Sequence, residues 1–168
     1  MKQKNMALFA AAALMASVSG FSAAQVRAPD EAPPEAVSRY VVGTRLGYIT
    51  CSNKYRDYVV KYERFALVNE GQNTVTGSPP SDEDYRACVQ ETLLKGRDMY
   101  GPASKQASTT AAKASLKEYQ TAWEGSLSNL GRPGGEKSAE YRTRQGKMQA
   151  QLDELQRKVE AQAKTNTR

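Results

Sequence analysis

The sequence contains no histidine, and this absence removes most of the familiar catalytic arrangements. A Ser-His-Asp triad, a Cys-His pair and a His-based metal cage all require an imidazole ring. The two cysteines, Cys51 and Cys88, are too few for a zinc site made of cysteine. The sequence also shows no Gly-x-Ser-x-Gly, Ser-x-x-Lys, phosphate-loop or calcium-loop pattern. We therefore expect no enzymatic activity and no bound metal or cofactor.

An acidic cluster is formed by Asp82, Glu83 and Asp84. Adjacent carboxylates could act as general acids and bases or hold a metal ion. They directly follow Ser81, however, and a capping serine with acids in the first turn is typical of a helix start. We interpret the cluster as the beginning of a helix.

The N-terminus predicts a cellular compartment in which the two cysteines would form a disulfide. Lys2 and Lys4 precede an apolar run over residues 6–18, and Ser22-Ala23-Ala24 supplies small residues before a cleavage point. These features are typical of a secretory signal peptide over residues 1–24, and no later segment is apolar enough to span a membrane. Exported proteins meet oxidising conditions, so we expect a structural Cys51–Cys88 disulfide in a periplasmic or secreted protein. A redox-active pair is disfavoured, since the two cysteines lack Cys-x-x-Cys spacing.

Tyrosines are the most distinctive feature of the first half of the chain. Positions from Val41 to Phe65 recur at alternating spacings of three and four, which places Tyr48, Tyr55, Tyr58 and Tyr62 on one helical face in phase with Cys51. The face can fill a core or form an aromatic binding surface. If it is open, the residues that we expect to contact a partner are Tyr55, Tyr58, Tyr62 and the single tryptophan, Trp123.

Basic residues exceed acidic ones, 24 to 18. Several lie in the last predicted helix, where they alternate with acids and suggest a solvated face. The alternative is contact with an anionic polymer of the cell envelope through Arg144, Lys147 and Arg157. Nothing in the sequence indicates nucleic-acid binding.

The elements that position these residues are all predicted to be helices. A helical pattern covers residues 36–69, with Gly43 and Gly47 weakening its first turns enough that the start could lie near Leu46. A second helix begins at Ser81 and stops at Gly101-Pro102. Two more are expected over residues 103–130 and 136–164.

Because Cys51 and Cys88 must meet, the first helix should extend past the hairpin, with the loop of residues 71–80 running back along it. We predict an all-α fold: an elongated antiparallel bundle of three or four helices with a disulfide-stapled hairpin. The expected organisation is a signal peptide (1–24), a disordered Pro-rich leader (25–38), a helical domain (39–130), and a hinge with an amphipathic, coiled-coil-like C-terminal helix (131–168). That last helix could close the bundle or stand free and pair with another chain.

Leu, Ile, Val and Phe make up less than a fifth of the residues after Ala24, so the core should be thin and dependent on the disulfide. The predicted function is that of an exported, non-enzymatic binding protein of the cell envelope: an adaptor, scaffold, chaperone-like protein or inhibitor with a protein partner. Binding of anionic envelope polymers through a basic helix face is the alternative, and a small hydrolase-type enzyme is the third option.

Overall fold

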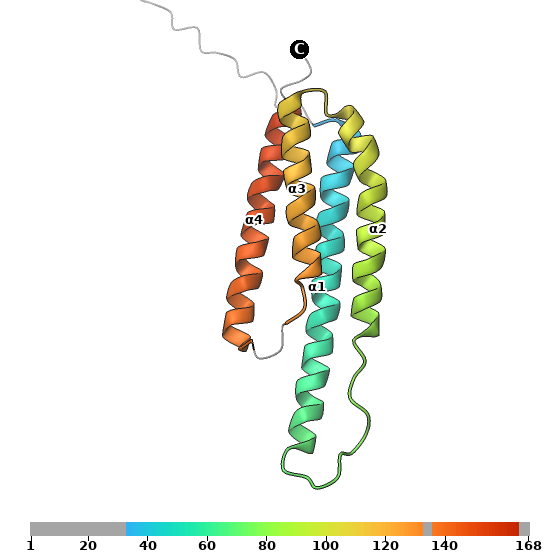
Figure 1. Cartoon of the computed structure of the whole chain (residues 1–168), viewed down its shortest axis with the longest axis vertical. Helices are drawn as coiled ribbons and strands as arrows, with labels where there is room; N and C mark the ends of the chain where they lie inside the picture. The colour runs from blue at the N-terminus through green and yellow to red at the C-terminus, as the bar shows by residue number, and fades with distance from the viewer. Residues whose placement is uncertain (1–32, 133–135, 165–168) are drawn as a thin grey trace, which may run out of the picture.

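The computed structural model describes residues 33–132 and 136–164. The predicted signal peptide and residues 25–32 of the predicted leader lie outside these described residues. Within them the chain forms α1 (Glu35–Asn69), α2 (Glu83–Gln106), α3 (Thr110–Ser128) and α4 (Ser138–Lys164). These four helices pack as antiparallel pairs, α1 with α2 and α3 with α4, which confirms the predicted all-α bundle (Figure 1).

Helix α1 begins at Glu35, earlier than the expected domain boundary at residue 39 and far earlier than Leu46. Pro34 takes the N-cap position, where its missing N–H costs nothing. The N–H of Ala36 donates to Oε1 of Gln106 at 2.8 Å, so the far end of α2 satisfies a backbone group in the first turn. Val37, only 1% exposed, anchors the same turn in the core.

Gly43 and Gly47 allow α2 to pack closely on α1. A Cβ atom at Gly47 would lie 2.4 Å from Cγ2 of Thr92, and one at Gly43 would lie 3.0 Å from Cε of Met99. The prediction that these glycines delay the start of α1 was wrong, because tertiary packing outweighs their low helix propensity.

The centre of the core joins α1 to α3. Trp123 and Tyr119 are fully buried. The indole N–H of Trp123 donates to the Thr44 carbonyl oxygen at 2.9 Å, and the Thr44 hydroxyl lies 3.0 Å from the Tyr119 hydroxyl. The Tyr40 ring meets the ring of Tyr119 edge-on at a centroid distance of 5.9 Å. Aromatic side chains thus supply much of a core that is poor in aliphatic ones.

Two predicted boundaries along α2 and α3 were wrong. Helix α2 does not stop at Gly101-Pro102 but continues to Gln106. Gly101 has no Cβ to clash with the proline ring, and Ala103 beyond it is fully buried. The chain breaks instead after Ala107, where the Thr109 side chain caps α3 by accepting from the N–H of Ala112 at 3.0 Å.

The start of α2 agrees with the prediction to within two residues. Its first residue is Glu83 and its N-cap residue is Asp82, while the Ser81 hydroxyl accepts a hydrogen bond from the Glu83 N–H at 3.1 Å. The acidic cluster therefore lies at a helix N-terminus, as interpreted from the sequence.

Helix α4 docks on the bundle, which answers the question that the sequence left open. Its contacts reach both neighbours: Lys158 pairs with Glu118 of α3 at 2.6 Å, and Asp153 pairs with Arg45 of α1 at 2.5 Å. Its buried side chains follow the predicted stripe, and they are Leu152, Leu155, Val159 and Ala163. No helix in the described ranges is long and apolar enough to cross a membrane.

The predicted disulfide is present. Cys51 of α1 and Cys88 of α2 are bonded, with their Cα atoms 5.6 Å apart. In an antiparallel pair this bond places Glu83, the first residue of α2, level with about Arg56 of α1. Residues 57–69 of α1, which we call the overhang, extend about 20 Å further. Figure 1 shows α1 passing the ends of the other three helices and the following loop running back beside it, as expected from the sequence.

Candidate functional site

The tyrosine face of α1 changes character along its length. Tyr48 and Tyr55 are 4% and 5% exposed, whereas Tyr58 is half-buried and Tyr62 is 47% exposed. The change falls where α2 begins, because on the side of α2 the overhang has only the returning loop beside it. Of the expected contact residues, Tyr62 is therefore at the surface, Tyr58 is at the boundary and Tyr55 is in the core.

The tyrosine rings nevertheless form one continuous cluster. Ring centroids are 6.0 Å apart between Tyr62 and Tyr58, and 6.0 Å apart between Tyr58 and Tyr55. Tyr55 also contacts Tyr85 of α2 at 4.9 Å and Tyr141 of α4 at 5.6 Å. Sequence reasoning placed Tyr85 and Tyr141 on their own helices but missed that all three helices bring their tyrosines to one end of the bundle.

This cluster fixes the α3–α4 connection to α1. The Tyr55 hydroxyl accepts from the Arg132 backbone N–H at 2.6 Å, and the Tyr141 hydroxyl donates to the Leu130 carbonyl oxygen at 3.2 Å. Burial raises the pKa of Tyr85 and Tyr141 above the ordinary tyrosine value. Both hydroxyls therefore stay protonated at neutral pH and serve as hydrogen-bonding groups.

Trp123 does not form part of an exposed surface. Its side chain is fully buried, and its ring lies against Gly96, where a Cβ would approach Cη2 to 2.1 Å. Trp123 and Tyr55 are thus core residues, and neither belongs to an open aromatic face. The core interpretation, which the sequence also allowed, holds for both.

Apolar side chains gather on the surface of the overhang and its loop. The loop is held against the helix by Asn69, whose Oδ1 accepts from the Thr76 N–H at 2.5 Å and whose Nδ2 donates to the Phe65 carbonyl oxygen at 2.9 Å. The exposed apolar residues of this end are Val60 (50%), Tyr62 (47%), Leu67 (70%), Val68 (55%) and Val75 (68%). Sequence reasoning singled out only Tyr62 among them.

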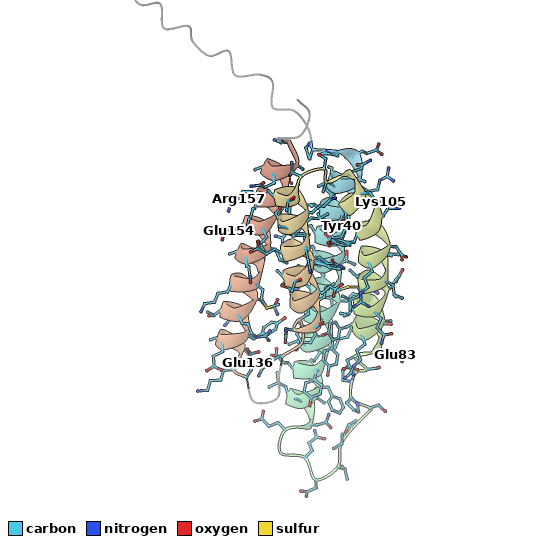
Figure 2. All side chains as sticks on the ribbon, turned by 45° about the horizontal axis from the view of Figure 1, so that its top comes forward. Tyr40, Glu83, Lys105, Glu136, Glu154 and Arg157 are labelled. Atoms are coloured by element: carbon cyan, nitrogen blue, oxygen red, sulfur yellow. A yellow bond between two sulfur atoms is a disulfide. The ribbon has the colours of Figure 1, made fainter. Side chains whose placement is uncertain are left out.

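The basic residues expected to contact an anionic polymer do not form one group. Arg144 is half-buried and forms a two-pronged pair with the Glu136 carboxylate, at 2.8 and 2.9 Å. This hydrogen bonding lowers the pKa of Glu136. Lys147 and Arg157 are exposed on α4, and Figure 2 shows Arg157 on the outer side of that helix. Arg144 is thus engaged within the protein, whereas Lys147 and Arg157 remain exposed to solvent.

A groove lies between α1 and α4 beside the tyrosine cluster, with a volume of about 440 Å³. Arg56 of α1, Arg132 of the α3–α4 connection and Arg142 of α4 line it together with Tyr48 and other residues. No pattern in the sequence predicts this groove, because its lining residues come from segments far apart in the chain.

Across residues 33–132 and 136–164, no three His, Cys, Asp or Glu residues lie close enough together to hold an ion. Asp82 of the acidic cluster is instead paired with Arg86, one helical turn away, at 2.7 Å.

Comparison with protein-family models, with curated proteins and with solved structures finds no match to this chain.

Proposed function

We propose that this chain is an exported, non-enzymatic binding protein of the cell envelope, and that it contacts a protein partner through the overhang of α1. The observation that carries the proposal is the group of exposed apolar side chains at this end, with Leu67 70% and Val68 55% exposed. Clustered apolar side chains at a protruding end are characteristic of interaction surfaces, whereas single exposed ones are common on any protein.

The energetic argument is that these side chains are unburied in the free protein. Covering one large aliphatic side chain is worth about 1.5–3 kcal/mol. Val60, Leu67 and Val68 lie seven and eight positions apart on one side of the helix, where they would supply the apolar part of an interface. The charged residues Lys61 and Glu63 flank this side and would form a polar rim, whereas Arg64 lies among the apolar side chains.

The proposed compartment rests on two observations. The first 24 residues have the composition of a secretory signal. The disulfide joins the two helices that carry the overhang and its loop, and such bonds persist in oxidising compartments. An adaptor, scaffold, chaperone-like or inhibitory role fits this arrangement.

The test is co-purification of the mature, oxidised protein from an envelope extract of its own cells, at low and high salt. We expect a stoichiometric protein partner that survives high salt, because an apolar contact is not screened. Leu67→Ser should abolish the capture. Leu94→Ser is the matched control, since Leu94 is similarly exposed (62%) but lies on α2, away from the overhang.

Two outcomes would contradict the proposal. Equal capture by the Leu67 and Leu94 variants would remove the overhang from the interface. Capture of wall or lipid polymer at low salt alone would favour the second candidate, an anionic polymer bound by the exposed Lys147 and Arg157.

A further inference from the structure

The groove between α1 and α4 combines an apolar floor with a basic rim. Its floor contains Tyr48, Tyr55, Val59 and Tyr141, and its volume of about 440 Å³ falls within the range of small-molecule sites. The groove reaches Val59 and Glu63 at the base of the overhang, but neither Leu67 nor Val68 lines it.

Three arginines reach the groove from three different segments: Arg56, Arg132 and Arg142. Among the described residues, Arg56 and Arg142 take part in none of the ion pairs, whereas Arg144 nearby is fully engaged with Glu136. Glu63 is the acidic residue found in the described lining. The groove therefore carries an excess of positive charge that the protein itself does not neutralise.

Arg132 is held in place by hydrogen bonds within the protein. Arg132 donates from Nη1 to the Ser138 hydroxyl at 3.1 Å and from Nε to the Glu136 carbonyl oxygen. Its backbone N–H donates to the Tyr55 hydroxyl, which fixes the same residue from the side of α1. A cation oriented in this way loses little freedom when it binds an anion.

The floor is equally well ordered. The Tyr48 hydroxyl donates to Oε1 of Gln145 at 2.8 Å, and Nε2 of Gln145 donates to the Leu130 carbonyl oxygen at 3.1 Å. The polar tips of the floor residues are thus bonded to the protein, so a ligand meets mainly ring edges and aliphatic carbon. Such a floor favours an apolar body and offers few groups to a hydroxyl-rich ligand.

We propose that this groove binds a small organic carboxylate with a flat apolar body, such as an aromatic acid. The body would lie on Tyr48, Val59 and Tyr141, and the carboxylate would face Arg142 and Arg56. Guanidinium and carboxylate groups form charge-assisted, two-pronged hydrogen bonds, so the charge and the shape of the ligand are both recognised. This site is independent of the partner surface proposed for the overhang.

The probe is 2-naphthoate, titrated into the mature, oxidised protein by calorimetry and by NMR. The neutral isostere 2-naphthamide has the same ring system without the charge. We expect saturable binding of naphthoate with shifts of the Tyr48 and Tyr141 ring signals. Naphthamide should bind about tenfold more weakly, the loss expected for one charge-assisted hydrogen bond.

The variants are matched for charge. Arg142→Gln should weaken naphthoate binding about tenfold, whereas Lys147→Gln, on the same helix but outside the groove, should not change it. Both side chains are exposed, so both variants should melt like the wild type, and Arg56→Gln serves as a second groove variant. Leu67→Ser should leave naphthoate binding intact, which separates this site from the overhang.

Three results would overturn the proposal: equal affinity for naphthoate and naphthamide, unchanged binding by both arginine variants, or no saturable binding in the millimolar range.

Discussion

Helix α1 contains two regions with the same sequence pattern and opposite surroundings. In the bundle, Tyr40, Tyr48 and Cys51 are almost completely buried by the helices that pack around them. In the overhang, Tyr62 continues the same face yet is 47% exposed. The comparison shows that periodicity defines which residues share a face, while the lengths and register of the neighbouring helices decide whether that face is core or surface.

The disulfide sets where this change occurs. By joining Cys51 to Cys88 it fixes the register of α1 against α2, and α2 begins at Glu83, only five residues before Cys88. The 13 residues of α1 beyond that level, 57–69, have no part of α2 opposite them. The fold thus produces a rigid body and a protruding end from one continuous helix, and the following predictions test that division.

The largest expected difference is in the loss of stability caused by truncating Trp123 in the bundle and Tyr62 in the overhang. Trp123→Ala should lower the free energy of unfolding by about 3–5 kcal/mol, because it leaves a cavity in the core. Tyr62→Ala should change it by less than about 0.5 kcal/mol, as surface substitutions usually do. Urea unfolding of both variants measures the difference, and similar losses would show that the overhang is part of the cooperative core.

The disulfide is expected to contribute almost as much. It closes a segment of 37 residues, and the loss of chain entropy in the unfolded state corresponds to about 3–4 kcal/mol. The double variant Cys51→Ala, Cys88→Ala should therefore melt at a much lower temperature or lose its cooperative transition. A melting curve that is unchanged under reducing conditions would contradict this account of the bundle.

Glycine positions give a smaller contrast between packed and open helix surfaces. Gly96→Ala should destabilise by about 1–3 kcal/mol, because the new Cβ would collide with the Trp123 ring. Gly146→Ala has no heavy atom within 4 Å of the new Cβ and should stabilise by roughly 0.5–1 kcal/mol through helix propensity. Thermal melting of both variants tests the sign and the size of each change in stability.

The smallest expected effect concerns alkaline pH. Burial raises the pKa of Tyr40 and Tyr119, so these groups stay protonated in the folded protein while their unfolded counterparts ionise near pH 10. The stability that each contributes is present below the unfolded pKa and declines as the pH rises above it.

Tyr40→Phe is the matched variant for this effect. In the described structure the Tyr40 hydroxyl is buried and has no hydrogen-bond partner, so its removal should not lower stability at pH 7. The variant should also lose less stability between pH 8 and pH 10.5 than the wild type, because one tyrosine fewer ionises on unfolding. Unfolding measured from pH 8 to pH 10.5 checks both statements, and an unaltered decline in the variant would contradict them.

Much of the fold could be predicted from the sequence. The spacing of the tyrosines, the two cysteines and the Gly- and Pro-rich loop at residues 71–80 together predict the helical hairpin, its disulfide and the overhang. These signals are local or involve one covalent bond, which makes them readable without knowledge of the tertiary structure.

The errors came from positions where tertiary contacts outweigh local preference. Gly43 and Gly47 indicate a weak helix in isolation, but they are where α2 approaches α1. Pro102 indicates a helix end, but the buried Ala103 holds α2 together beyond it. The cap at Thr109 lies in a run of Ser, Thr and Ala that offers several equivalent candidates.

The candidate sites were even less accessible to sequence reasoning. The groove brings together Arg56, Arg132 and Arg142, which are far apart in the chain and share no spacing. Leu67 and Val68 lie off the stripe that carries the tyrosines, so the periodicity gives no reason to single them out. Surfaces of this kind are products of topology, and the linear pattern does not encode them.

The central claim is that the overhang is the part of the molecule that meets a partner. The most direct measurement places a photo-crosslinking residue at Leu67 or at Leu94 in the full chain, expressed in its own cells, and identifies what each position captures. The account predicts one defined protein at Leu67, absent at Leu94, with capture that persists at high salt. Identical products at both positions, or no protein at Leu67, would contradict it.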